Sequence, residues 1–104
     1  MGSPQWLVWR QRWLGAWIRI HGSEPTCLAC GRPWSLRHDD LHHRSYDHLG
    51  HEGFCDLIPL CRACHNWVHR ILESTPAWRR MDRAQATDVI VARLRRAARS
   101  EAER

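Results

Sequence analysis

The sequence predicts a small α+β domain, in which a two-stranded sheet and a helix are held by a closed metal site and flanked by further helices. Three observations support this fold class. Two C-x-x-C pairs occupy 27–30 and 61–64. Short segments at 41–43 and 56–60 suit strands, and apolar residues recur at helical spacing towards both ends. A chain of 104 residues is expected to form one domain, 1–104.

The first element is an amphipathic helix over 5–20. Four tryptophans share one face of it, at spacings of three, four and four residues: Trp6, Trp9, Trp13 and Trp17. Ser3 suits the N-cap and Pro4 the first helical position. The tryptophan face either packs on the rest of the domain or forms a surface for bases or a second copy. We favour packing, because a small domain needs that buried area.

The cysteine pairs predict a structural Zn²⁺ site. Its ligands are the four thiolates of Cys27, Cys30, Cys61 and Cys64. Each short turn brings two sulfurs within about 2.3 Å of one ion, and two turns complete a tetrahedral shell. A redox dithiol is the alternative, and two pairs in so short a chain make it less favoured. The fifth cysteine, Cys55, is expected to be a small buried apolar residue.

The remaining elements follow in order. A zinc-held core over 27–73 contains the two strands and then a helix over 64–73, which together form a strand–strand–helix unit. A helical extension over 76–99 begins after Thr75, and Asp82 suits the cap of its longer helix. Ligating rather than cross-linking cysteines suit a reducing compartment, so a cytoplasmic protein without a membrane segment is expected.

Histidines predict a second metal site of a different kind. His65 and His69 are four residues apart on the predicted helix and project from one face, and His42 on the first strand can meet them. Nitrogen ligands favour Zn²⁺, Ni²⁺, Co²⁺ or Mn²⁺ over Mg²⁺. His43 points to the other side of a regular strand and is left as a base. Any one of these histidines alone is more simply explained as a hydrogen-bonded polar residue.

The charge indicates a polyanionic partner. The formal net charge is +5, and all 16 basic residues are arginine. Nucleic acid is the commonest partner of such a chain, and guanidinium groups match phosphate oxygens. Coding bias also explains the absence of lysine. The candidate DNA-binding residues are Arg44, Arg62 and Arg70, although a solvated side chain is an equally good reading of Arg44.

The pattern from Cys27 to His69 resembles the HNH endonucleases of the His-Me finger (ββα-metal) group, in the subset with two C-x-x-C knuckles. The matching segments are CLACG and LHHRSYDHLGHEGFCDLIPLCRACHNWVH, within 43 of the 104 residues. The resemblance implies a DNA-cleaving site with one divalent cation.

The same resemblance assigns roles to individual residues. It implies that His43 is the general base, that His42 and His65 are metal ligands, and that His69 is an additional ligand. Asp56 stands where the family has Asn. An Asp accepts hydrogen bonds from backbone donors and could orient the loop, but it cannot donate as an amide does.

The expected function is therefore a metal-dependent DNA endonuclease or nickase of low sequence specificity. The active-site cation would be Mn²⁺, Ni²⁺, Zn²⁺, Co²⁺ or Mg²⁺. The resemblance implies products with 5′-phosphate and 3′-hydroxyl ends, and it makes a phage packaging terminase a candidate partner. Two alternatives stay open: a non-catalytic zinc module that binds nucleic acid, and a protein-interaction module that uses the tryptophan face. Whether the chain is a monomer or a homodimer is left undetermined.

Overall fold

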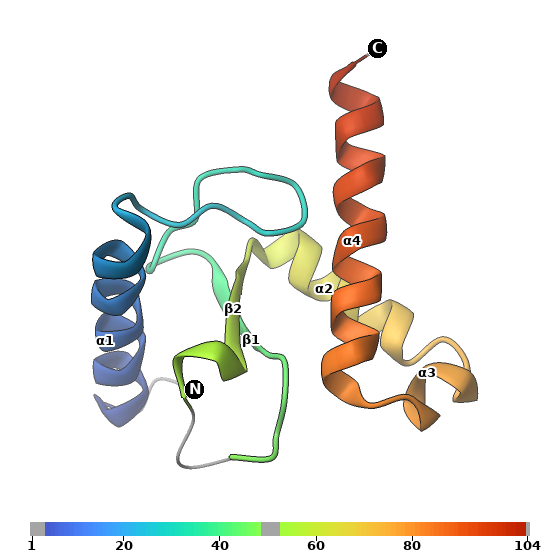
Figure 1. Ribbon diagram of the computed structural model, residues 1–104, viewed down its shortest axis with the longest axis horizontal. Helices are drawn as coiled ribbons and strands as arrows, with labels where there is room; N and C mark the ends of the chain where they lie inside the picture. Colours follow the sequence, from blue (N-terminus) through green and yellow to red (C-terminus); the bar gives the residue numbers. More distant parts are fainter. Residues whose placement is uncertain (1–3, 49–52, 104) are drawn as a thin grey trace.

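The computed structural model describes residues 4–48 and 53–103 (Figure 1). The elements run in the order α1 (Pro4–His21), β1 (Asp40–His43), a 3-10 turn η1 (Phe54–Asp56), β2 (Leu57–Leu60), α2 (Arg62–Leu72), α3 (Pro76–Arg80) and α4 (Arg83–Ala102). The α+β class is confirmed. The proposed capping residue Ser3 lies outside the described residues. None of the helices formed by the described residues has the length and apolar character needed to cross a bilayer.

The two strands form an antiparallel pair that divides the interior. His42 lies opposite Ile58, and His43 lies opposite Leu57. Because side chains alternate along a strand, neighbouring residues face different layers. Leu57 belongs to the cluster that contains tryptophans of α1, whereas Ile58 packs against the cluster of α2 and α4. In Figure 1 the sheet accordingly lies between α1 on one side and α2 with α4 on the other.

The tryptophan face of α1 packs against the sheet, as the favoured alternative predicted. Trp13 is 3% exposed and belongs to a core with Trp34, Leu41 and Leu57. Its ring lies 5.3 Å from that of Trp34 and 5.8 Å from that of Phe54. Two further tryptophans of α1, Trp6 and Trp17, pack against the same core, while Trp9 lies outside this cluster.

The second core joins the cysteine pairs to α2 and α4. Its buried members are Cys27, Ala29, Leu60, Cys61, Val68, Leu72, Ala86 and Ile90. Cys61 caps α2, because its sulfur accepts a hydrogen bond from the Cys64 N–H at 3.5 Å. Hence α2 begins at Arg62, two residues before the predicted start.

Three local predictions need correction. Cys55 was expected to be buried but is exposed. It lies in the single turn η1, which directs Phe54 to the tryptophan core and leaves Cys55 towards solvent. The returning strand begins at Leu57 rather than Asp56, because Asp56 closes that turn. At the other end, α4 continues to Ala102, three residues beyond the expected end of the helical extension at residue 99.

Candidate metal centres and active site

The four cysteines of the two pairs form one cluster. Their sulfurs all lie within 4.8 Å of one another, and the Cys30 and Cys61 sulfurs are 3.8 Å apart. Tetrahedral zinc with Zn–S bonds of about 2.3 Å separates its sulfurs by about 3.8 Å, so the donor set fits this ion. Gly31, at φ +81°, lets the first knuckle turn back, and its N–H donates to the Cys27 carbonyl at 2.9 Å.

The surroundings change the pKa values of these thiols in different directions. Burial raises the pKa of Cys30 and of Cys64. Burial also acts against ionisation of Cys27, but hydrogen bonds from backbone groups outweigh it and lower the pKa of that thiol. A divalent cation would favour the thiolate at all four positions, since its charge compensates for burial.

Three histidines form the second cluster. His42 comes from β1, and His65 and His69 come from one face of α2. One ring nitrogen from each lies within 4.8 Å of the other two, and the Nε2 atoms of His65 and His69 are 3.0 Å apart. Two ligands at about 2.0–2.1 Å from a tetrahedral ion would be about 3.3 Å apart. The cluster therefore has suitable chemistry and spacing for a divalent cation.

In His65 and in His42, one ring nitrogen contacts a neighbouring side chain, and the other nitrogen is left for such an ion. His65 Nδ1 lies 3.0 Å from Asp40 Oδ2, and His42 Nε2 lies 3.2 Å from Thr87 Oγ1. His42 is fully buried, and its Nδ1 has no hydrogen-bond partner among the described residues. An Asp behind a ligating His fixes the tautomer that directs a lone pair at the metal.

The surroundings favour the neutral form of two of these histidines, His42 and His69. Burial, followed by the charge of Arg83 and the neighbouring imidazoles, lowers the pKa of His42 to about 3. Burial is also the main cause of a lowered pKa at His69. Imidazole must be neutral to bind a metal, so this environment favours the ligating form.

His43 lies on the opposite side of β1 from His42, as predicted. Its ring stacks on Trp6 at 5.8 Å and on Tyr46 at 5.5 Å between centroids. Even so, His43 shares a cavity of about 250 Å³ with His65 and His69. The predicted base and two predicted ligands thus line one cavity between β1 and α2.

Asp56 lies in the turn before β2 and contacts the backbone next to the predicted base. Its carboxylate accepts a hydrogen bond from the Gly53 N–H at 2.7 Å and lies 3.1 Å from His48 Nδ1. Its carbonyl accepts a hydrogen bond from the N–H of Arg44, the residue after His43, at 2.8 Å. Within the described residues, Asp56 is not part of the histidine cluster.

The three candidate DNA-binding arginines have different surroundings. Arg44 forms a two-pronged ion pair with Asp88 of α4, at 2.9 and 2.8 Å, which ties the end of β1 to that helix. Arg62 is exposed and lies 3.3 Å from Asp40. Arg70 lies over the ring of Trp67.

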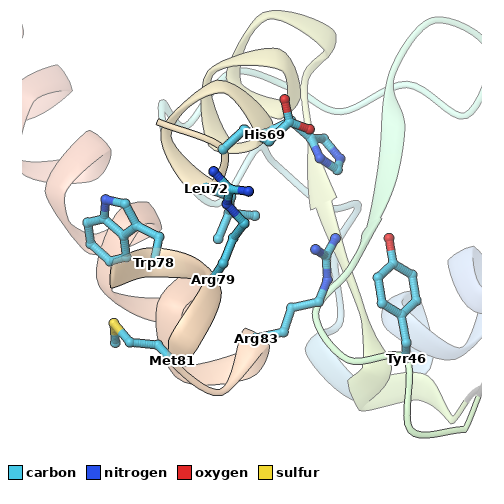
Figure 2. Close-up of a pocket in the computed structure, with 8 residues that line it drawn as sticks. Tyr46, His69, Leu72, Trp78, Arg79, Met81 and Arg83 are labelled. Carbon is cyan, nitrogen blue, oxygen red and sulfur yellow. The ribbon is translucent and has the colours of Figure 1, made fainter. Parts of the chain in front are cut away.

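Sequence reasoning missed Arg83, the first residue of α4. Its Nε donates to the His43 carbonyl at 2.9 Å, and its guanidinium lies 4.2 Å from the ring centroid of Tyr46. Its Nη2 is buried and has no hydrogen-bond partner among the described residues. Figure 2 shows this side chain between Tyr46 and His69. No local signal indicated it, because Arg83 and His43 are 40 residues apart.

Two supporting residues were missed as well. Asp40 was within reach of sequence reasoning, because it stands two residues before His42 and lies on the same face of a strand. Thr87 gave no such signal, since its contact with His42 depends on how α4 docks.

Comparison with known proteins yields no match: no family model, no curated protein and no solved structure corresponds to this chain. Functional inference therefore depends on the geometry of these clusters.

Proposed function

We propose that this chain is a metal-dependent nuclease that hydrolyses phosphodiester bonds in DNA. One observation carries the proposal: three imidazole nitrogens converge within 4.8 Å, and a fourth imidazole, that of His43, lines the same cavity. A cation site beside an imidazole that can accept a proton is the minimal equipment for activating water against a phosphate. The earlier resemblance to HNH endonucleases agrees with these roles.

Charge favours a phosphodiester as substrate. The chain carries a net charge of +5, and the buried Nη2 of Arg83, which lines the cavity, has no hydrogen-bond partner among the residues that the structure describes. A buried guanidinium nitrogen without an acceptor is costly, and a phosphate oxygen is the acceptor that this group matches best. Arg83 would therefore hold the scissile phosphate.

His43 would remove a proton from the attacking water. Stacking on Trp6 and Tyr46 holds its ring, and Arg83 holds its backbone carbonyl. The water oxygen bonds to phosphorus, the bond from phosphorus to the 3′-oxygen breaks, and the departing oxygen takes a proton from solvent. The products would carry 5′-phosphate and 3′-hydroxyl ends.

His42, His65 and His69 would hold the divalent cation, which would supply positive charge beside the phosphoryl and leaving oxygens. Asp40 would orient His65. Asp56 would position the base from the turn before β2, through its contacts with Gly53 and Arg44. A terminase partner remains an expectation from the resemblance.

A plasmid-nicking assay tests the proposal. The protein, with zinc at the cysteines, is given Mn²⁺, Ni²⁺, Co²⁺, Zn²⁺ or Mg²⁺ in turn, with EDTA as the blank. We expect nicking that requires an added cation and that falls by at least about 10²-fold in His43→Ala, the usual contribution of a general base. His38→Ala is the matched control, because His38 is exposed and does not line the cavity.

Undiminished nicking by His43→Ala would reject the base assignment. DNA binding without cleavage under every cation would reject the nuclease and leave the non-catalytic zinc module. In both cases circular dichroism and zinc content must match those of the unmodified protein.

A further inference from the structure

We infer that the substrate strand lies in one groove that passes over the histidine cluster and continues on both sides of it. This inference rests on the proposed function and adds where the flanking nucleotides bind. The groove has a central part at the histidines, an α1 arm and an α3 arm. Each arm is a separate hollow that shares wall residues with the central cavity.

Shared wall residues place the three hollows next to one another. The α1 arm, of about 380 Å³, shares Trp6, Arg10 and Asp40 with the central cavity of about 250 Å³. The α3 arm, of about 290 Å³, shares Tyr46, His69 and Arg83 with the same cavity. A ligand that crosses the histidines can therefore extend in both directions without leaving the protein surface.

The α1 arm presents positive charge. Arg37 is exposed and makes no ion pair with another described residue, and Arg62 is 69% exposed despite its contact with Asp40. The carboxylates in this arm are already engaged: Asp39 accepts a hydrogen bond from the Ser35 N–H, and Asp40 lies against His65 and Arg62. Arg37 is thus available for phosphates, and Arg62 adds an exposed positive charge beside it.

The α3 arm combines basic and apolar side chains, as Figure 2 shows. Arg79 is exposed and makes no ion pair with another described residue, and Arg83 lies where this arm meets the central cavity. Trp78 and Met81 add an apolar wall. Guanidinium groups suit phosphates, and an aromatic wall suits a sugar or base. Glu73 also lines the arm and opposes a polyanion.

This distribution favours a strand over a single nucleotide. A mononucleotide at the histidines would fill the centre and at most one arm, and it would leave the arginines of the other arm without a partner. A strand places phosphates on both sides of the bond that is cut. Arg37 and Arg79 would then contact phosphates on opposite sides of that bond.

The test uses oligonucleotides with one ordinary phosphodiester and phosphorothioates elsewhere, which keep the backbone charge and confine rapid cleavage to one bond. One series is shortened on the 5′ side of this bond and the other on the 3′ side. The values of kcat/KM are compared for the unmodified protein, Arg37→Gln, Arg79→Gln and Glu73→Gln. Arg96→Gln is the matched control, because Arg96 is exposed and lines none of the three hollows.

The effect of each arginine variant on kcat/KM should change in only one of the two series of shortened oligonucleotides. Arg37→Gln and Arg79→Gln should each lower kcat/KM by about three- to tenfold on full-length substrate, as expected for an exposed charged contact. That loss should vanish when the nucleotides on one side are removed, and the side should differ between the two variants. Glu73→Gln should raise kcat/KM with the same dependence as Arg79→Gln. The groove would be rejected if the loss of kcat/KM did not depend on which side is shortened, or if neither variant lowered kcat/KM.

Binding separates this inference from the proposed function. In a His43→Ala background, fluorescence anisotropy with the same oligonucleotides should show that each arginine variant lowers the salt slope of log K by about one, while Arg96→Gln leaves it unchanged. If no substrate is ever cleaved but these slopes change, the nuclease fails and the groove stands. If cleavage occurs and the slopes stay constant, the groove fails alone.

Discussion

At the residue scale, His42 shows how the fold keeps a proposed metal ligand in the neutral form. The side chain is fully buried on the α2 and α4 face of β1, where Arg83 and two other imidazoles surround it. Burial removes water from the ring, and the neighbouring charge opposes its protonation. The fold therefore keeps the His42 imidazole neutral beside the two other proposed ligands, and its stability should consequently depend on pH.

This dependence on pH can be tested by measuring the free energy of unfolding. An unfolded His has a pKa of about 6.5, whereas the pKa of folded His42 is lowered to about 3. Between these values the unfolded state binds a proton that the folded state refuses, so the free energy of unfolding falls as the pH falls. From pH 6.5 to 5.5 the loss should be about 1 kcal/mol. Urea unfolding of the zinc-loaded protein, free of other cations, measures it.

The variant His42→Asn is the control for this effect. It cannot take up the proton, so its free energy of unfolding should change by about 1 kcal/mol less over the same interval. Parallel pH profiles for the two proteins would show that His42 titrates normally.

Asp40 supports a second prediction at this scale. It contacts His65 at 3.0 Å, and outer partners of this kind typically contribute 10–100-fold in metal affinity. We expect Asp40→Ala to bind Ni²⁺ or Mn²⁺ about 10–100-fold more weakly by calorimetry. Asp88→Ala, which removes an arginine-paired carboxylate outside the cluster, should retain the affinity. Equal affinities in all three proteins would contradict the role of Asp40.

At the scale of elements, α4 determines whether the site is complete, because it contributes both Arg83 and Thr87. The helix begins at a cap: the Asp82 carboxylate accepts a hydrogen bond from the Gln85 N–H at 3.2 Å. Asp82→Ala should therefore cost about 0.5–2 kcal/mol in urea unfolding. Asp82→Asn keeps an acceptor at the same position and should cost much less. Equal losses in the two variants would show that the cap is not the cause.

The sequence predicted these elements well where the signals were local. Helical spacing predicted α1 and α2, and strand alternation correctly placed His42 and His43 on opposite sides. Cys55 was misplaced because one turn of 3-10 helix before β2 has no periodicity to recognise.

The candidate site was predictable only in part, for a related reason. The cysteines and histidines carry metal-ligand spacing within short segments, and the structure brings each predicted set together. Arg83 and Thr87 reach the site through the docking of α4, which spacing cannot reveal. Conversely, Arg44 had the right position in the sequence for a phosphate contact, but its guanidinium is paired with Asp88.

At the scale of the whole molecule, the fold consists of two small cores on either side of a sheet with only two strands. The cysteine cluster belongs to the core beneath α2 and α4, and it joins the loop after α1 to the start of α2. A two-stranded sheet is marginal by itself, and structural zinc in small domains contributes on the order of 10 kcal/mol to folding. A metal ion at the histidine cluster is not expected to contribute comparably to folding, since His65 and His69 are held by the helix that carries them.

The two sites should therefore respond differently to metal removal. Mild chelation that empties only the histidine cluster should abolish nicking and leave the circular dichroism spectrum unchanged. Loss of zinc from the cysteines should abolish cooperative unfolding, because the loop of Cys27 would separate from α2. Cys61→Ser should show this loss, as it removes both a ligand and the cap of α2, whereas Cys55→Ser should keep one tightly bound zinc per chain. A zinc-free protein that still unfolds cooperatively would mean that the two cores suffice without the metal.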